Sequence, residues 1–140
     1  MANADLGSPL TASTAGRSSA FSGCGSTAGH TYKFFFVLSP GESITIGQTS
    51  NIFDSEHSVF WSESANPASY PAAGGGSCIE YSSYRTQAVS RTNAGSAPRK
   101  LWFVVNGYDT IDYGNFTLQW TITGGDPALS SSPHAPAYYP

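Results

Sequence analysis

The chain has 140 residues, of which 39% are hydrophobic, 14% aromatic and 11% charged, with a formal net charge of −3. This length suits one domain with its own core and is too short for two comfortable ones. The weak negative charge excludes a dominant electrostatic attraction to nucleic acid or to anionic lipid. Few charges with many Ser, Thr, Gly and aromatic residues indicate an extracellular β-protein, because helical cytosolic proteins carry many more Lys and Glu.

The first segment, residues 1–22, is small and polar, with repeated Ser, Thr, Ala and Gly. Its anchors are Leu6, Leu10 and Phe21. Because it lacks helical periodicity, we predict an extended N-terminal arm or an edge strand.

Short strand-like stretches punctuated by Gly, Pro and Asn occupy residues 23–126. The first, residues 30–38, leads into a turn at 39–42, where proline presets φ and glycine supplies a positive one. Residues 43–47 alternate again, and we predict that they form the hairpin partner of the first stretch. Further strands are predicted at residues 57–61, 78–81, 86–90, 100–106 and 114–122. A Pro/Ala/Gly/Ser-rich insertion at 62–77 is long enough to be mobile or functional.

The last of these stretches alternates without error. Apolar and polar side chains take turns along it, so one face is buried and the other is wet. The apolar series is Phe116, Leu118, Trp120 and Ile122. The wet face carries the sequon Asn115-Phe116-Thr117, which predicts N-glycosylation of Asn115 on a secreted surface.

These features predict an all-β chain built as a single antiparallel β-sandwich of about seven or eight strands. The pattern stops after residue 126, and residues 127–140 are predicted to form a Pro/Ser-rich, extended tail. No apolar run approaches the ~20 residues of a membrane span, so none is predicted.

Two cysteines, Cys24 and Cys78, lie 54 residues apart. With the sequon they favour one disulfide in an oxidising compartment, worth roughly 4 kcal/mol in the chain-entropy model. The alternative is two unpaired buried thiols. The start of the chain lacks the basic and apolar regions of a signal peptide. Either a signal has been removed or the sequon does not imply secretion, and we favour the first.

The densest polar cluster is Asp54-Ser55-Glu56-His57. On an extended chain Ser55 and His57 share one face while Asp54 and Glu56 share the other, so the four cannot converge as a nucleophilic triad would require. We therefore predict a capped turn and a strand, and no enzyme.

A calcium site could use one of two pairs of carboxylates, either Asp54 and Glu56 or Asp109 and Asp112, which lie in different loops. The alternative is that these side chains hydrogen-bond their own turns, because neither loop has the oxygen density of an EF-hand. Three histidines (His30, His57 and His134) are never at metal-ligand spacing, and no other metal site or cofactor is predicted.

Sugar-binding sandwiches present aromatic rings to pyranoses, and we name Tyr70 and Trp61 as candidate glycan platforms. Tyr70, in the long insertion, is expected to be the more exposed. The strand residues Trp61 and Trp102 are more typical of a packed core, and further aromatic candidates are Tyr81, Tyr84 and Tyr108.

Several motifs occur in order along the chain: Tyr32-Lys33-Phe34, Pro40-Gly41-Glu42, Phe53-Asp54-Ser55, the block 101–108 and the block 114–118. Their order and spacing over roughly residues 5–123 resemble the bacterial pre-peptidase C-terminal domain and its relatives in large secreted bacterial and algal surface proteins. The resemblance implies a jelly-roll β-sandwich without catalytic activity, used beside proteases or as a repeated unit of cell-surface and matrix proteins, sometimes with calcium or carbohydrate. Asn106 stands where family members often carry Asp, which weakens the calcium inference.

The tail resembles the hydroxyproline-rich, O-glycosylated segments of algal and plant wall glycoproteins. The residues that this resemblance marks for modification are Ser130, Ser131, Ser132, Pro133 and Pro136.

We therefore expect a secreted, non-enzymatic structural glycoprotein module at the cell surface or in the matrix. It would self-associate into a fibre through exposed strand edges and its terminal arms. The alternative is a carbohydrate-binding module accessory to a secreted hydrolase.

Overall fold

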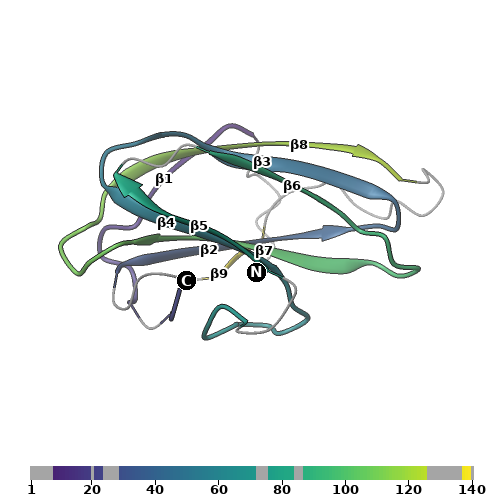
Figure 1. Cartoon of the computed structure of the whole chain (residues 1–140), viewed down its shortest axis with the longest axis horizontal. Coiled ribbons are helices and arrows are strands. Elements are labelled where there is room, and N and C mark those ends of the chain that lie inside the picture. The colour runs from purple at the N-terminus through teal and green to yellow at the C-terminus, as the bar shows by residue number, and fades with distance from the viewer. Residues whose placement is uncertain are drawn as a thin grey trace.

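The computed structural model describes residues 8–19, 21–23, 29–71, 76–83, 87–125 and 137–139, with the backbone alone for 76–83 and 137–139. These residues form nine β-strands and no helix. The strands make two antiparallel sheets that stack as two layers (Figure 1). The predicted all-β sandwich is confirmed.

Each sheet has a simple strand order. The four-stranded sheet contains, in order, β1 (Leu10–Ser13), β8 (Asn115–Gly124), β3 (Glu42–Asn51) and β6 (Ala88–Thr92). The five-stranded sheet contains, in order, β5 (Gly76–Ser83), β4 (Asp54–Trp61), β7 (Arg99–Gly107), β2 (Thr31–Leu38) and β9 (Ala137–Tyr139).

The pairing of the first eight strands follows one rule. The first strand pairs with the eighth, the second with the seventh, the third with the sixth and the fourth with the fifth. A long hairpin rolled up on itself gives this order, which is the jelly roll of two Greek keys. The jelly-roll topology expected from the resemblance is thus present in the strand order.

The predicted hairpin between β2 and β3 is wrong. The turn forms at the expected place, with Gly41 at φ 80, but it carries the chain from the five-stranded sheet to the four-stranded one. Asn93 secures this corner, since Gly41 N donates to Asn93 O at 2.8 Å and Asn93 N donates to Glu42 O at 2.9 Å. Alternation along a strand shows which side chains face the core. It does not show whether two successive strands pair in one sheet or lie in opposite sheets.

The main core lies between the sheets. It is built from the inward-facing residues of both layers, and its largest members include Phe34, Phe36, Phe103, Phe116 and Leu118. Along β8, residues 116, 118 and 120 are buried while 115, 119 and 121 are exposed, so the predicted alternation is confirmed. Burial of this apolar area is the main favourable term in folding.

A second, smaller core covers the outer face of the five-stranded sheet. Phe21, Phe60, Trp102 and Val104 are buried there. They lie beneath the segment before β2 and the loop after β4: Ser22 N donates to Ala68 O at 3.0 Å, and Tyr70 N donates to Ser22 O at 2.8 Å. This explains why residues 101–105 are all fully buried: both faces of β7 are covered.

The two terminal segments join the sheets. Residues 10–13 form β1 at the edge of the four-stranded sheet, in register with β8. Residues 137–139 form β9 beside β2, which the sequence analysis did not anticipate. The rest of the predicted tail, including Ser130, Ser131, Ser132, Pro133 and Pro136, lies outside the described residues.

Candidate functional site

Two loops meet at one end of the sandwich, the β3–β4 turn and the β7–β8 loop. The second loop folds tightly: Asp112 N donates to Asp109 O at 3.0 Å, and Asp109 N donates to Asp112 Oδ2 at 3.1 Å. A Cβ at Gly107 would overlap Asp112 O, so only glycine fits at the start of this loop. Tyr108 N donates to Asp54 O at 3.0 Å, which ties the loop to the start of β4.

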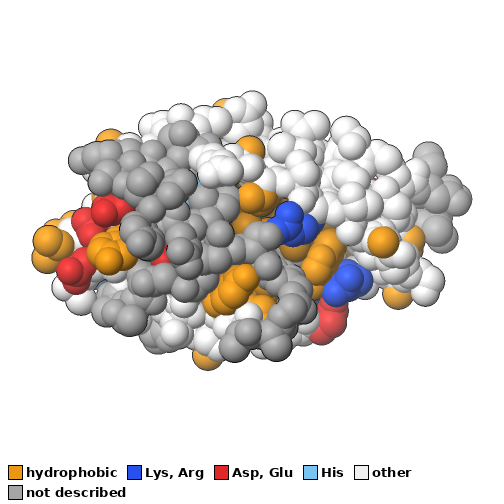
Figure 2. Space-filling view, viewed as in Figure 1, with side chains coloured by type: hydrophobic (Ala, Val, Ile, Leu, Met, Phe, Trp, Pro, Cys, Tyr) orange, Lys and Arg blue, Asp and Glu red, His pale blue; other side chains and the backbone are white. Residues whose placement is uncertain are grey.

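Exposed apolar side chains gather at this end. Ile111 is 79% exposed, Ile52 63%, Tyr113 51% and Tyr108 42%. Ile52 lies beside Gly114, because a Cβ at Gly114 would stand 3.0 Å from Ile52 Cγ1. Figure 2 shows hydrophobic and acidic side chains together at its left end, where the β7–β8 loop lies. Apolar side chains exposed together, rather than singly, are typical of contact surfaces.

Three carboxylates lie among these apolar residues, and they are electrostatically coupled. Burial raises the pKa of Asp112, the N–H of Asp109 lowers it, and the charges of Asp54 and Asp109 raise it further. A nearby negative charge disfavours the ionised form of a carboxyl group and so raises its pKa. We call the group Ile52, Asp54, Tyr108, Asp109, Ile111, Asp112 and Tyr113 the acidic end.

The two pairs of carboxylates that were named as alternative calcium sites are arranged differently from each other. Asp54, Asp109 and Asp112 lie at the acidic end, whereas Glu56 is fully buried on the outer face of β4 beneath Gly23. Asp109 Oδ1 accepts the N–H of Thr110 at 2.5 Å, as the turn-capping alternative requires. Within the described part of the chain no group of three or more His, Cys, Asp or Glu side chains is placed to hold a metal ion.

Ser55 and His57 face the core between the sheets, opposite to Glu56, as their alternation predicts. Ser55 Oγ accepts a hydrogen bond from Gln48 Nε2 at 3.1 Å and one from Asn51 Nδ2 at 2.7 Å. The same Gln48 amide contacts His57 Nε2. Gln48 is 1% exposed and both Ser55 and His57 are fully buried, so this network joins β3 to β4 inside the sandwich.

The network is accompanied by two irregularities in the sheets. The register of β3 shifts between residues 48 and 50, and that of β4 against β5 shifts between 55 and 57. Bulges of this kind redirect side chains locally. Sequence reasoning missed Gln48 as the partner, because it lies on a strand of the other sheet.

The two candidate glycan platforms are packed. Tyr70 is half-buried in the second core and meets Phe60 edge-on at 6.0 Å, so the expectation that it is the exposed ring is wrong. The ring of Trp61 is half-buried, with the Arg99 guanidinium 4.4 Å above it. Trp102 is fully buried, as its strand position predicts, and donates Nε1–H to Ser62 O at 3.1 Å. Tyr81 and Tyr84 have no described side chains.

The predicted glycosylation residue, Asn115, is exposed at the start of β8 on the outer face of the four-stranded sheet. Thr117 of the sequon shares that face, and its Oγ1 lies 3.1 Å from Thr11 Oγ1 on β1. An exposed Asn115 side chain on this face is compatible with a glycan. The predicted disulfide lies outside the described side chains, although the backbone of Cys78 pairs with Ser58 in β4.

The outer face of the four-stranded sheet is flat and rich in hydroxyl groups. Pairs of hydroxyls bridge its strands, at 2.8 Å between Thr45 Oγ1 and Ser90 Oγ and at 2.6 Å between Ser43 Oγ and Thr92 Oγ1. A shallow hollow of about 220 Å³ on this sheet is lined by residues of β3, β6 and β8, including Thr45, Gly47, Ala88, Gln119 and Thr121.

Comparison of the chain with protein-family models, with curated proteins and with solved structures gives no match. The resemblance to the pre-peptidase C-terminal domain therefore stays an expectation from the sequence. In the described chain no helix has the length and apolar character needed to cross a bilayer.

Two of the four apolar residues at the acidic end had a signal in the sequence. Ile52 and Ile111 are large aliphatic residues inside turn segments, where solvent exposure is the rule. That signal alone could not show that the two turns meet, because their meeting depends on the jelly-roll topology.

Proposed function

We propose that the chain is a non-enzymatic, extracellular structural glycoprotein module, a subunit or repeat of a cell-surface fibre or matrix. It assembles through strand edges and terminal arms. The observation that carries the proposal is the seating of the N-terminal arm: residues 10–13 pair as a short edge strand with residues 115–118 of β8. A terminal strand held by so few backbone bonds can be exchanged with a neighbouring copy at low cost.

Free edges supply further contacts. Within the described chain β6 pairs only with β3, and β5 pairs only with β4. One side of each strand therefore directs backbone N–H and C=O groups outward, which is the template for adding a strand from another chain.

The glycan fits the same function. A sugar chain on Asn115 would stand on the hydroxyl-rich outer face beside β1, whose Ser13 is the register partner of Asn115. It would cover this face while leaving the β5 and β6 edges open. The difference in intact mass before and after enzymatic deglycosylation of native material, repeated with Asn115→Gln, measures this.

A pair of engineered cysteines tests arm exchange directly. The hydroxyls of Thr11 and Thr117 lie 3.1 Å apart, so the double variant Thr11→Cys/Thr117→Cys can form a disulfide across the β1–β8 pair. If the arm is exchanged, oxidised assemblies run as covalent oligomers on a non-reducing gel. If the arm stays on its own β8, the same bond closes within one chain.

The matched control is Thr45→Cys/Ser90→Cys, whose hydroxyls lie 2.8 Å apart on β3 and β6. Both residues belong to the body of the sandwich, so this bond stays within one chain in any assembly. Assemblies in which both double variants give only monomers exclude arm exchange. A wild-type protein that shows no assembly by light scattering up to millimolar concentration contradicts the proposed function.

A second candidate function is a carbohydrate-binding module accessory to a secreted hydrolase. The acidic end favours it, because the exposed Tyr108 and Tyr113 lie beside Asp109 and Asp112, a combination that can stack on a pyranose and bind its hydroxyls. Polysaccharide pull-down that is lost in Tyr108→Ala and Tyr113→Ala, and kept in Tyr70→Ala, would support it.

A further inference from the structure

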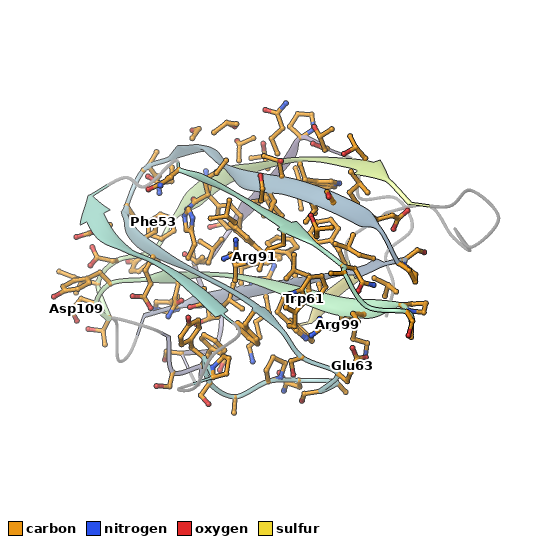
Figure 3. All side chains as sticks on the ribbon, turned by 45° about the vertical axis from the view of Figure 1, so that its right-hand side comes forward. Phe53, Trp61, Glu63, Arg91, Arg99 and Asp109 are labelled. Carbon is orange, nitrogen blue, oxygen red and sulfur yellow. The ribbon has the colours of Figure 1, made fainter. Side chains whose placement is uncertain are left out.

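Two pairs of like-charged residues lie at the two ends of β7. Arg99 and Lys100 begin the strand, and Asp109 and Asp112 follow its last residue, Gly107. A strand of this length spans about 30 Å, so the two groups lie at opposite poles of the sandwich. Figure 3 shows Asp109 and Arg99 at opposite sides of the molecule.

The acidic end combines negative charge with apolar area. The charges of Asp54 and Asp109 help to raise the pKa of Asp112, and four large apolar side chains are exposed at the same end. Arg17, on the β1 side of this end, has its guanidinium held over the ring of Tyr32 at 4.4 Å from the centroid. The surface therefore fits a partner that brings cations together with apolar groups.

The opposite pole has that composition. Arg99 lies over Trp61 at 4.4 Å, and the Nζ of Lys100 stands 5.2 Å from the ring centroid of Phe35. Val37, the register partner of Lys100, is 44% exposed. We call Arg99, Lys100, Trp61, Phe35 and Val37 the basic end. Glu63, the acid beside it, accepts the backbone N–H of Lys100 at 3.1 Å.

We propose that the acidic end of one copy docks on the basic end of the next, an inference that rests on the proposed structural function. The two surfaces are different patches of the same chain, so the contact is heterologous and does not close a dimer by two-fold symmetry. Repetition of the contact produces a linear filament with one polarity. Because charges at its rim attract across solvent, the filament weakens as ionic strength rises.

Charge reversal at each end tests the pairing. The acidic-end variant is Asp109→Lys/Ile111→Lys, and the basic-end variant is Arg99→Glu/Lys100→Glu. All four side chains lie at the surface or at its margin, so the fold should survive, and circular dichroism with a thermal melt checks it. Thr121→Lys, on the outer face of β8, is the control for an added charge elsewhere.

At low salt, the fraction of assembled protein measured by sedimentation velocity should be at least tenfold lower for each variant alone than for the wild type. The control Thr121→Lys should assemble as the wild type does. A 1:1 mixture of the two variants should restore long species, because the new Lys end of one meets the new Glu end of the other. Rescue in the mixture is the result that a general loss of stability cannot produce.

Each contrary outcome has one meaning. If the wild type assembles and both variants assemble equally well, head-to-tail docking is wrong and the strand-edge proposal stands. If the variants fail alone and their mixture also fails, the two ends do not contact each other. If the acidic-end variant loses polysaccharide binding and keeps assembly, the acidic end is a glycan site and the docking inference is wrong. If the wild type never assembles, the proposed function itself fails.

Discussion

Gly23 lies directly against the buried carboxylate of Glu56, so a Cβ at Gly23 would overlap Glu56 Oε1 and stand 2.8 Å from Asn106 Nδ2. Glu56 and Asn106 are Cα partners on β4 and β7, and both are fully buried. The segment before β2 is therefore the cover over two polar side chains on the outer face of the five-stranded sheet. Burying a carboxyl group is costly unless its oxygens are hydrogen-bonded or paired. The packing of Gly23 over Glu56 should therefore be sensitive to small changes in side-chain volume.

Gly23→Ala tests that sensitivity. The added methyl group has no space, so the segment must lift or the Glu56 side chain must move, and we expect a loss of about 1–3 kcal/mol in the free energy of unfolding. Urea denaturation followed by tryptophan fluorescence measures it. The control is Ser22→Ala, which removes an exposed side chain and keeps both backbone bonds of Ser22, and it should change stability by less than about 0.5 kcal/mol. A Gly23→Ala protein as stable as the control would contradict the described packing.

Asn93→Ala should be among the most damaging single polar substitutions in the chain. Asn93 is fully buried, and its Nδ2 donates to Leu38 O at 2.8 Å and to Ala97 O at 2.9 Å. Its Oδ1 accepts the N–H of Gly95 at 3.0 Å. Alanine leaves these backbone groups without partners at the β2–β3 corner, and we expect a loss of about 2–4 kcal/mol.

The matched control for that experiment is Asn66→Ala. Asn66 is exposed, and its Oδ1 accepts a hydrogen bond from Lys33 Nζ at 2.8 Å. Solvent can replace this bond, so the change in unfolding free energy should stay below about 1 kcal/mol. Equal effects of the two substitutions would mean that Asn93 does not secure the corner.

The backbone just before Cys24 and the backbone of Cys78 both lie beside β4, which bears on the predicted disulfide. Gly23 precedes Cys24 and lies against Glu56, and two residues along β4 Ser58 is the register partner of Cys78. Gly23, the residue before Cys24, and the backbone of Cys78 therefore adjoin the same stretch of β4, and we expect a Cys24–Cys78 bond in protein made in an oxidising compartment. Intact mass should fall by about 2 Da relative to the reduced chain.

Reduction, or the double variant Cys24→Ser/Cys78→Ser, should then lower the free energy of unfolding by roughly 4 kcal/mol. The single variant Cys78→Ser serves as the control, since it should produce the same loss and leave one thiol that reacts with a maleimide. Two thiols that react with a maleimide in wild-type protein denatured without reductant would show that the alternative of two unpaired buried thiols is correct.

The sequence predicted what each strand buries better than it predicted where each strand lies. Alternation in β8 identified Phe116, Leu118 and Trp120 as core and Asn115 as solvent-exposed, because side-chain direction along a strand is a local property. The near-continuous apolar run of β7 suits a central strand, and β7 lies between β4 and β2 in its sheet.

Neighbour relations and the surface site were harder to predict. The β2–β3 turn has the residues of a hairpin, yet β2 and β3 belong to different sheets, so the turn is a corner between sheets. Tyr70 was expected to be exposed because its loop is rich in Gly, Ala and Pro, yet the ring packs on Phe60. The acidic end depends on the meeting of two turns that are far apart in the sequence, and local patterns carry no information about that meeting.

Asp112 predicts a pH dependence with a definite sign. Burial and the charges of Asp54 and Asp109 raise its pKa in the folded chain above the ordinary value of 3.8. An acid with a raised folded pKa stabilises the fold when protonated; this contribution is fully present below the unfolded pKa and is lost as the pH rises through the folded pKa. Asp112→Asn removes the charge and keeps an oxygen that can accept the Asp109 N–H, so the variant should be more stable than the wild type at pH 7.

The advantage of Asp112→Asn should shrink as the pH falls from 7 through the raised pKa of Asp112 towards the ordinary value of 3.8, because the wild-type carboxyl becomes neutral. Thermal melts at intervals of half a pH unit measure the difference in Tm, and Glu63→Gln at the basic end is the control for carboxylates outside the cluster. High salt should also reduce the difference at pH 7, since it screens Asp54 and Asp109. A lower stability of Asp112→Asn than of the wild type at pH 7 would contradict this prediction. It would mean that the hydrogen bond from the Asp109 N–H to the ionised Asp112 carboxylate stabilises the fold more than the repulsion from Asp54 and Asp109 destabilises it.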